Sequence, residues 1–168
     1  MIPDAFNLRR KVAIVTGCGT GLGRGMALGL AKAGADIAGV YNNSEPDCGA
    51  EITKMGRRFL PVKANLSDLD QLDPLVEQTV EAFGRVDILV NNAGIIRRQP
   101  ALEFTRENWD EVVNLNLRSL FFLAQAVAKR FVAQKTGGKI INIASMLSFQ
   151  GGILVPSYTA SKSGVMGL

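Results

Sequence analysis

The sequence contains no histidine and only two cysteines, Cys18 and Cys48, which do not form a CxxC pair. Protein zinc sites and many iron sites are built largely from these two residue types. Histidine is also the base that most often activates a serine nucleophile. The composition therefore predicts no bound metal and disfavours hydrolysis by a Ser-His pair.

Long apolar runs are also missing. No stretch reaches the roughly 18 residues that a membrane helix needs, and the first ten residues lack the apolar core of a signal peptide. The 19 basic and 15 acidic residues give a net charge of +4, with the basic ones scattered singly or in pairs. We expect no membrane partner, no nucleic-acid partner and a cytoplasmic protein.

Short apolar segments alternate with longer segments of helical period, which predicts strands at 12–16, 37–41, 59–62, 88–91 and 139–143 and helices at 22–33, 46–55, 69–83 and 109–134. Runs such as Val12-Ala13-Ile14-Val15 are typical of parallel strands covered on both faces. The order predicts a single α/β domain over residues 1–168, a Rossmann-type doubly wound parallel sheet in three αβα layers. Because the sequence ends inside a further helix after Pro156, we expect this fold to be truncated at its C-terminal end.

A glycine-rich loop follows the first strand, with the spacing TGxxxGxG: Gly17, Thr20, Gly21, Leu22 and Gly23. A strand-to-helix turn without Cβ atoms lets backbone amides approach a pyrophosphate, and the helix N-terminus favours the anion. A dinucleotide site is predicted, with an ordinary glycine-rich turn as the alternative in a chain of 18 glycines.

The end of the second strand bears on the choice of cofactor. A carboxylate there binds the ribose hydroxyls of NAD, whereas a basic residue pairs with the phosphate of NADP. This sequence has Tyr41, followed by Asn42 and Asn43, and Thr20 in the loop is neutral too. The absence of a basic residue favours NAD(H) and leaves NADP(H) open.

Near the C-terminus, Tyr158 and Lys162 are four residues apart and so share one face of a helix. A tyrosine that transfers protons near neutral pH needs a cation that lowers its pKa, which Lys162 would supply. Ser145 lies after the 139–143 strand, at the edge where doubly wound sheets bind ligands. A chance Tyr-x-x-x-Lys pair is the alternative if Ser145 is ignored.

Two further segments of the candidate site contain asparagine. Asn92, Ala93 and Gly94 follow the apolar strand 88–91, at the same edge of the sheet. Asn116 lies inside a predicted helix, where asparagine is a poor helix former. A locally bonded or solvated side chain is the simpler explanation of Asn116 alone.

Together these motifs, in this order, resemble the short-chain dehydrogenase/reductase family from Lys11 to Leu168. The resemblance implies an oxidoreductase with a catalytic tetrad: Tyr158 as the general acid/base, Ser145 polarising the carbonyl, Lys162 binding the nicotinamide ribose and lowering the tyrosine pKa, and Asn116 holding a relay water. It also implies a homo-oligomer, a tetramer. The cofactor residues implied are Gly17, Thr20, Gly21, Leu22, Gly23, Tyr41, Asn65, Leu66, Asn92, Ala93, Gly94, Tyr158 and Lys162.

Segments 57–60, 95–98 and 143–152 resemble one subfamily, the bacterial 2-keto-3-deoxygluconate 5-dehydrogenases. This resemblance implies a sugar-acid substrate from pectin and uronate breakdown, oxidised or reduced at C5. Arg97 and Arg98 follow the 88–91 strand, where a guanidinium could pair with the substrate carboxylate; a solvated surface pair is the alternative. The substrate contacts expected are Arg97, Arg98, Ser145, Gln150 and Tyr158.

The sequence also departs from the family pattern. Asn65 and Tyr41 each stand where the family usually has aspartate, and family members reach roughly 250 residues, within the range of a single domain. We expect two strands and a substrate-covering loop to be absent. Gluconate 5-dehydrogenase and 3-oxoacyl reductase activities stay open as alternatives, as does a nonenzymatic nucleotide-binding fragment.

Overall fold

Five short strands rich in branched apolar residues pair in parallel in the computed structural model, which describes residues 6–168. They are β1 (Val12–Thr16), β2 (Asp36–Tyr41), β3 (Phe59–Lys63), β4 (Ile88–Asn91) and β5 (Lys139–Asn142). Their order in the sheet is β3-β2-β1-β4-β5, so the chain reverses direction across the sheet after β3. The predicted doubly wound parallel sheet is confirmed.

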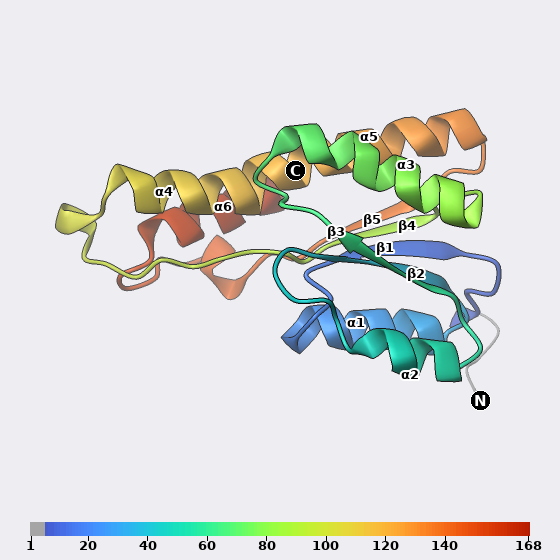
Figure 1. Cartoon of the computed structure of the whole chain (residues 1–168). Helices are drawn as coiled ribbons and strands as arrows, with labels where there is room; N and C mark the ends of the chain where they lie inside the picture. Colours follow the sequence, from blue (N-terminus) through green and yellow to red (C-terminus); the bar gives the residue numbers. More distant parts are fainter. Residues whose placement is uncertain (1–5) are drawn as a thin grey trace.

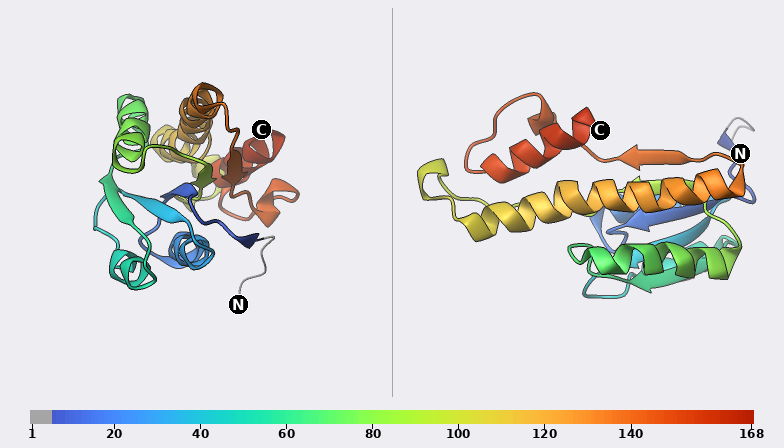
Figure 2. Two further views of the ribbon diagram at one scale, coloured as in Figure 1. Left: turned by 90° about the vertical axis from the view of Figure 1, so that its right-hand side faces the viewer. Right: turned by 90° about the horizontal axis from the view of Figure 1, so that it is seen from above.

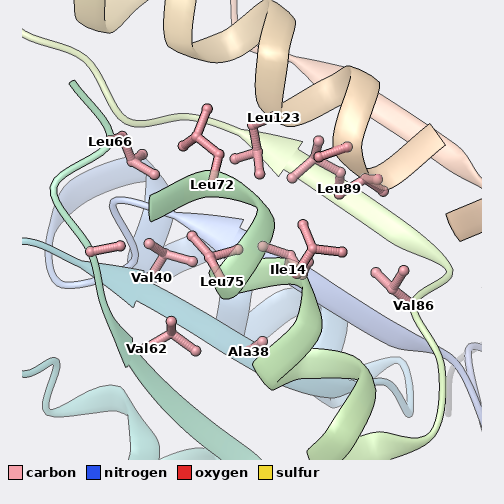
Figure 3. Close-up of a cluster of buried hydrophobic side chains, with 14 of the residues drawn as sticks. Ile14, Ala38, Val40, Val62, Leu66, Leu72, Leu75, Val86, Leu89 and Leu123 are labelled. Carbon is pink, nitrogen blue, oxygen red and sulfur yellow. The ribbon is translucent and has the colours of Figure 1, made fainter. Parts of the chain in front are cut away.

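Helices cover both faces of this sheet (Figure 1). One layer holds α1 (Gly21–Lys32) and α2 (Cys48–Lys54), and the other holds α3 (Leu72–Phe83) and α5 (Leu120–Gln134). Each layer buries its own apolar cluster against the sheet. Figure 3 shows side chains of the cluster under α3 and α5, among them Ile14, Leu75, Leu89 and Leu123. The three-layer arrangement follows from this burial on both faces.

The predicted burial of strands on both faces holds for β1 and β4, where every residue is buried. In β5, by contrast, Ile140 and Ile141 are 37% and 43% exposed, and within the described residues this strand pairs with β4 alone. An apolar run alone does not distinguish a central strand from an edge strand.

The predicted helix 109–134 is longer and less regular than its pattern indicated. It begins as α4 (Arg106–Val113), after Thr105 accepts a hydrogen bond from the Asn108 amide at 3.2 Å. It then passes through a π-helical segment, η4 (Asn114–Ser119), into α5. Figure 2 shows one continuous rod, with α6 (Pro156–Gly167) beside its first half.

Other boundaries differ by a few residues. The predicted helix 69–83 opens with a 3-10 turn, η2 (Leu69–Gln71), and the predicted helix 46–55 is confined to α2. Two further 3-10 turns, η3 (Ala101–Glu103) and η5 (Met146–Ser148), interrupt the loops that precede α4 and α6. Within residues 6–168, no helix combines the length and apolar character needed to cross a membrane.

Candidate active site

A groove of about 820 Å³ runs along the carboxyl ends of the strands. Its walls come from the loops after β1, β2, β3 and β4, which the parallel sheet brings to one edge. Doubly wound folds bind ligands at this edge, where the strand order reverses. The groove is lined by eleven of the thirteen predicted cofactor residues: Gly17, Thr20, Gly21, Leu22, Gly23, Tyr41, Asn65, Leu66, Asn92, Ala93 and Gly94.

Two glycines of the loop are required by close packing. A Cβ at Gly23 would lie 2.0 Å from the Gly17 carbonyl oxygen and 2.5 Å from Asn92 Nδ2. Gly17 itself has a φ of +65°, and a Cβ there would lie 3.0 Å from Asn92 Nδ2. The first turn of α1 is thereby pressed against the loop, as it must be for the loop amides and the helix amides to face one ligand.

The free backbone amides at the N-terminus of α1 are not capped by a neighbouring side chain. Thr20 occupies the N-cap position without a side-chain hydrogen bond, and the first turn carries no acidic residue. A Cβ at Gly21 would meet nothing within 4 Å. The amides of this turn therefore face open groove, and the cradle fits the pyrophosphate of a dinucleotide.

Thr16 and Asn92 fasten the loops after β1 and β4 to each other. The Thr16 hydroxyl accepts hydrogen bonds from the amides of Asn92 and Ala93, at 2.9 and 3.0 Å. In return, Asn92 Nδ2 donates to the Thr16 and Gly17 carbonyl oxygens, at 2.9 and 3.3 Å. Asn92 thus shapes the glycine loop as well as lining the groove.

At the β2 end the groove is lined by Tyr41, Asn42 and Asn43, with no basic side chain from this part of the structure. Arg24 in α1 does not line the groove, since its guanidinium contacts Asp47, at 3.1 Å, and Glu51. The wall that faces the adenosine end of a dinucleotide is therefore uncharged.

Beyond the other end of the sheet edge lie Ser145, Tyr158 and Lys162. The buried Lys162 ammonium donates to the Ile143 carbonyl oxygen at 2.5 Å and lies 5.8 Å from the centre of the Tyr158 ring. Burial lowers the pKa of Lys162. Ser145 Oγ accepts from the Leu147 amide at 3.2 Å, and neither it nor the Tyr158 hydroxyl donates to any described residue. The protons of these two hydroxyls are thus not engaged by any described residue.

Ser148 couples these residues, a role that our reading of the sequence missed. Its hydroxyl donates to the Lys162 carbonyl oxygen at 2.7 Å and accepts from the Ser145 amide at 3.3 Å. Ser163 adds a bond from its hydroxyl to the Ser148 carbonyl oxygen at 3.3 Å. The Ser-x-x-Ser spacing of a capping box was the available signal.

Asn116 is fully buried in η4, and its side chain has a specific partner. Oδ1 accepts from the Ile95 amide and Nδ2 donates to the Ile95 carbonyl oxygen, both at 2.9 Å, while Nδ2 also contacts Ser161 Oγ at 3.3 Å. Both N–H donors and one lone pair of Oδ1 are therefore engaged. The geometry supports a positioning role for this side chain.

The predicted substrate residues differ in where the structure places them. Arg97 lines the groove and is paired with Glu111 on α4, with Nε and Nη2 at 2.9 and 2.7 Å from the same Oε2. Arg98 and Gln150 are exposed, with no hydrogen bond to the described residues. Ser145, Tyr158 and Lys162 are close in the fold but do not line the groove.

Comparisons with known proteins agree with this geometry. Residues 11–168 match the family model described as short chain dehydrogenase. A 2-dehydro-3-deoxy-D-gluconate 5-dehydrogenase of Escherichia coli (strain K12) is 61% identical over all 168 residues. A 3-oxoacyl-[acyl-carrier-protein] reductase of Synechocystis is 39% identical over 95% of the chain. The chain spans 66% of the length of either relative.

Among solved structures, a candidate 2-deoxy-D-gluconate 3-dehydrogenase from Agrobacterium tumefaciens, with bound NADP, is 45% identical and superposes with a TM-score of 0.86. The match covers 98% of this chain and 65% of that one. The family resemblance drawn from the motifs is confirmed, and the chain belongs to the short-chain dehydrogenase family.

Proposed function

We propose that this protein is an NAD(H)-dependent oxidoreductase that interconverts an alcohol and a ketone of a sugar acid, at C5 of 2-keto-3-deoxy-D-gluconate. The observation that carries the proposal is the buried Lys162 ammonium 5.8 Å from the centre of the Tyr158 ring. The hydroxyls of Tyr158 and of Ser145 donate to no described residue, which leaves both available to a substrate. The substrate rests on the 61% identity to a dehydrogenase of that name.

The cradle formed by Gly17, Gly23 and the first turn of α1 would hold the pyrophosphate, with Asn92 and Ala93 along the wall toward the nicotinamide. When bound, the nicotinamide ring accepts or donates the hydride. The uncharged wall at Tyr41, Asn42 and Asn43 supports NAD(H) over NADP(H), because no basic side chain there would neutralise an added phosphate.

The chain's own residues would manage the proton. In oxidation, the Tyr158 phenolate would take the proton of the substrate hydroxyl, and in reduction the Tyr158 phenol would return one. The Lys162 ammonium, 5.8 Å from the ring centre, would stabilise the phenolate form that precedes oxidation and follows reduction. The Ser145 hydroxyl donates a hydrogen bond to the same substrate oxygen, where negative charge develops. We further propose a cytoplasmic homo-oligomer, a tetramer, by family likeness.

Replacing Tyr158 tests the proposal. Tyr158→Phe removes the acid/base and keeps the ring, so we expect kcat to fall by about 10²- to 10⁴-fold, while NADH binding is still detected in a fluorescence titration. Ser157→Ala is the matched control. It deletes the buried neighbouring hydroxyl, which has no partner among the described residues, and leaves kcat unchanged.

Turnover is measured as sugar-acid-dependent change in NADH absorbance, with NADP(H) and a 3-oxoacyl thioester as comparison substrates. Equal rates for Tyr158→Phe and the parent protein would exclude the role given to Tyr158. NADH binding without turnover of any substrate would favour a nonenzymatic nucleotide-binding protein instead.

A further inference from the structure

The groove contains a charge pair whose acidic member has no role in the mechanism above. Arg97 and Glu111 are the only charged residues among the described residues that line the groove. Arg97 comes from the segment after β4 and Glu111 from α4, and neither belongs to the glycine loop. Any ionic discrimination by the groove lining itself therefore depends on these two side chains.

Arg97 is carried by a segment that is fixed at both ends. Ile95 is bound through both of its backbone groups by Asn116. Two residues beyond Arg97, the Gln99 amide donates to the Leu154 carbonyl oxygen at 2.8 Å, and the Gln99 side chain accepts from Asn108 Nδ2 at 3.1 Å. The backbone of Arg97 is thus held in place without help from Glu111.

Glu111 instead orients the guanidinium. Arg97 Nε donates to Glu111 Oε2 at 2.9 Å, Nη2 lies 2.7 Å from the same oxygen, and Nη1 donates to the Ile96 carbonyl oxygen at 3.3 Å. A guanidinium has five N–H donors, so three are without a hydrogen bond in the described structure. Planar, paired N–H groups of this kind suit a carboxylate.

Exposure shows that the pair is not built for stability. The side chains of Arg97 and Glu111 are 41% and 54% exposed, and pairs of this kind add little to folding. The Glu111 carboxylate nevertheless lies against the guanidinium that an incoming carboxylate would use. It therefore weakens the binding of anions there, while having little influence on uncharged ligands.

We infer that Glu111 is a positioning residue that sets charge selectivity at the substrate end of the groove: it holds Arg97 ready for a substrate carboxylate and competes with that carboxylate for it. This inference rests on the proposed sugar-acid substrate. It assigns to Glu111 a role that neither the motifs nor the relatives' names contain.

Equilibrium binding to the NADH-saturated protein tests the inference, measured by calorimetry with 2-keto-3-deoxy-D-gluconate and with its uncharged C1 amide. Glu111→Gln keeps a hydrogen-bond acceptor and removes the competing charge, so we expect the acid to bind about two- to fivefold more tightly and the amide unchanged. Arg97→Gln weakens the binding of the acid but not of the amide. Adding Glu111→Gln to this variant does not tighten the binding of the acid. Asp110→Asn, on the same helix but outside the groove lining, controls for net charge and changes neither Kd.

Three results would overturn the inference: equal changes for acid and amide, no change in Glu111→Gln, or an undiminished gain in the double variant. Lack of binding of either compound by the parent protein would overturn it too. Because this readout is binding, it is independent of turnover. If turnover is normal but Glu111→Gln affects the acid and the amide alike, only the role of Glu111 is excluded. If Glu111→Gln affects the acid alone but no turnover is found, only the proposed reaction is excluded.

Discussion

At the scale of single residues, Gly23 is the position where added volume costs most. A Cβ there would meet the Gly17 carbonyl oxygen at 2.0 Å, and this oxygen belongs to backbone that cannot rotate away. We expect Gly23→Ala to destabilise the fold by about 1–3 kcal/mol and to weaken NADH binding at least tenfold, because α1 must move away from the loop. Urea unfolding and a fluorescence titration measure the two effects.

Gly25, two residues further along α1, is the matched control. A Cβ at Gly25 meets nothing within 4 Å, and alanine favours a helix interior over glycine by about 0.5–1 kcal/mol. Gly25→Ala therefore stabilises the protein and leaves NADH affinity unchanged. Similar effects of both substitutions would contradict the packing explanation.

The residues of the glycine loop can be recognised in the sequence because their spacing is local, and the structure places them along one groove. It did not reveal Thr16, Ser148 or Glu111 as contributors to the site. Thr16 acts on Asn92 and Ala93, more than 70 positions away in sequence, and Glu111 acts on Arg97 across 14 positions. Such partners are set by the tertiary fold, and a single hydroxyl or carboxylate carries no periodic signal.

At the scale of elements, Asn116 joins η4 to the segment after β4. Asn116→Ala leaves the Ile95 amide and carbonyl oxygen without their side-chain partner, at a cost of about 1–3 kcal/mol for each group that stays buried. We therefore expect a loss of about 2–4 kcal/mol in urea unfolding and faster hydrogen exchange at the Ile95 amide.

Asn114 lies in the same π-helical segment, and its side chain has no hydrogen bond among the described residues. Asn114→Ala should change stability by less than about 0.5 kcal/mol. If the two alanine variants were equally stable, the Asn116 bonds would not be what fixes the segment.

The helical period predicted where α3 and α5 end, at Phe83 and Gln134, since an apolar stripe repeats wherever a helix covers a sheet. It did not predict η4, because one widened turn barely disturbs that stripe. The signal that did exist was Asn116, a poor helix former in a helix. Its occurrence in a helix suggested a specific reason, and in the structure this reason is its hydrogen bonding to Ile95, 21 positions away.

At the scale of the whole molecule, the two ends of the sheet have separate tasks. The groove occupies the carboxyl ends of the strands, and Asp87 stabilises the opposite end. This buried carboxylate accepts from the Val12 amide at 3.0 Å, from Lys11 Nζ at 3.3 Å, and from Arg85 Nε and Nη2 at 2.8 and 2.5 Å.

Burial alone would raise the pKa of Asp87, but the bonds from Arg85 and the Val12 amide outweigh it and lower the pKa below its ordinary value. A lowered folded-state pKa means that the carboxylate stabilises the fold above its unfolded pKa, near 3.9, and that this stabilisation is lost as the pH falls through the folded value. We expect the free energy of unfolding to decrease with acid below about pH 4.

Asp87→Asn tests this expectation by urea unfolding across the pH range. It should lower the free energy of unfolding by about 2 kcal/mol at neutral pH and make that free energy fall less steeply with acid. NADH affinity should stay unchanged, because the groove lies at the other end of the sheet. Asp70→Asn, at an exposed carboxylate, should retain the parent pH profile. An unchanged acid profile for Asp87→Asn would contradict the assignment.

The π-helical turn at Asn114–Ser119 also has a meaning for changes in chain length. Such a turn holds one residue more than the α-helical turn it replaces, so the extra residue is absorbed locally and α4 and α5 keep their phase around the common axis. Deleting a single residue of this turn other than Asn116 would leave a regular helix, with Glu111 still facing the groove. Deleting Val112 or Val113 in α4 instead would rotate Glu111 by about 100° away from it. The π-helical turn is therefore the part of the rod in which a change of length by one residue should be tolerated best.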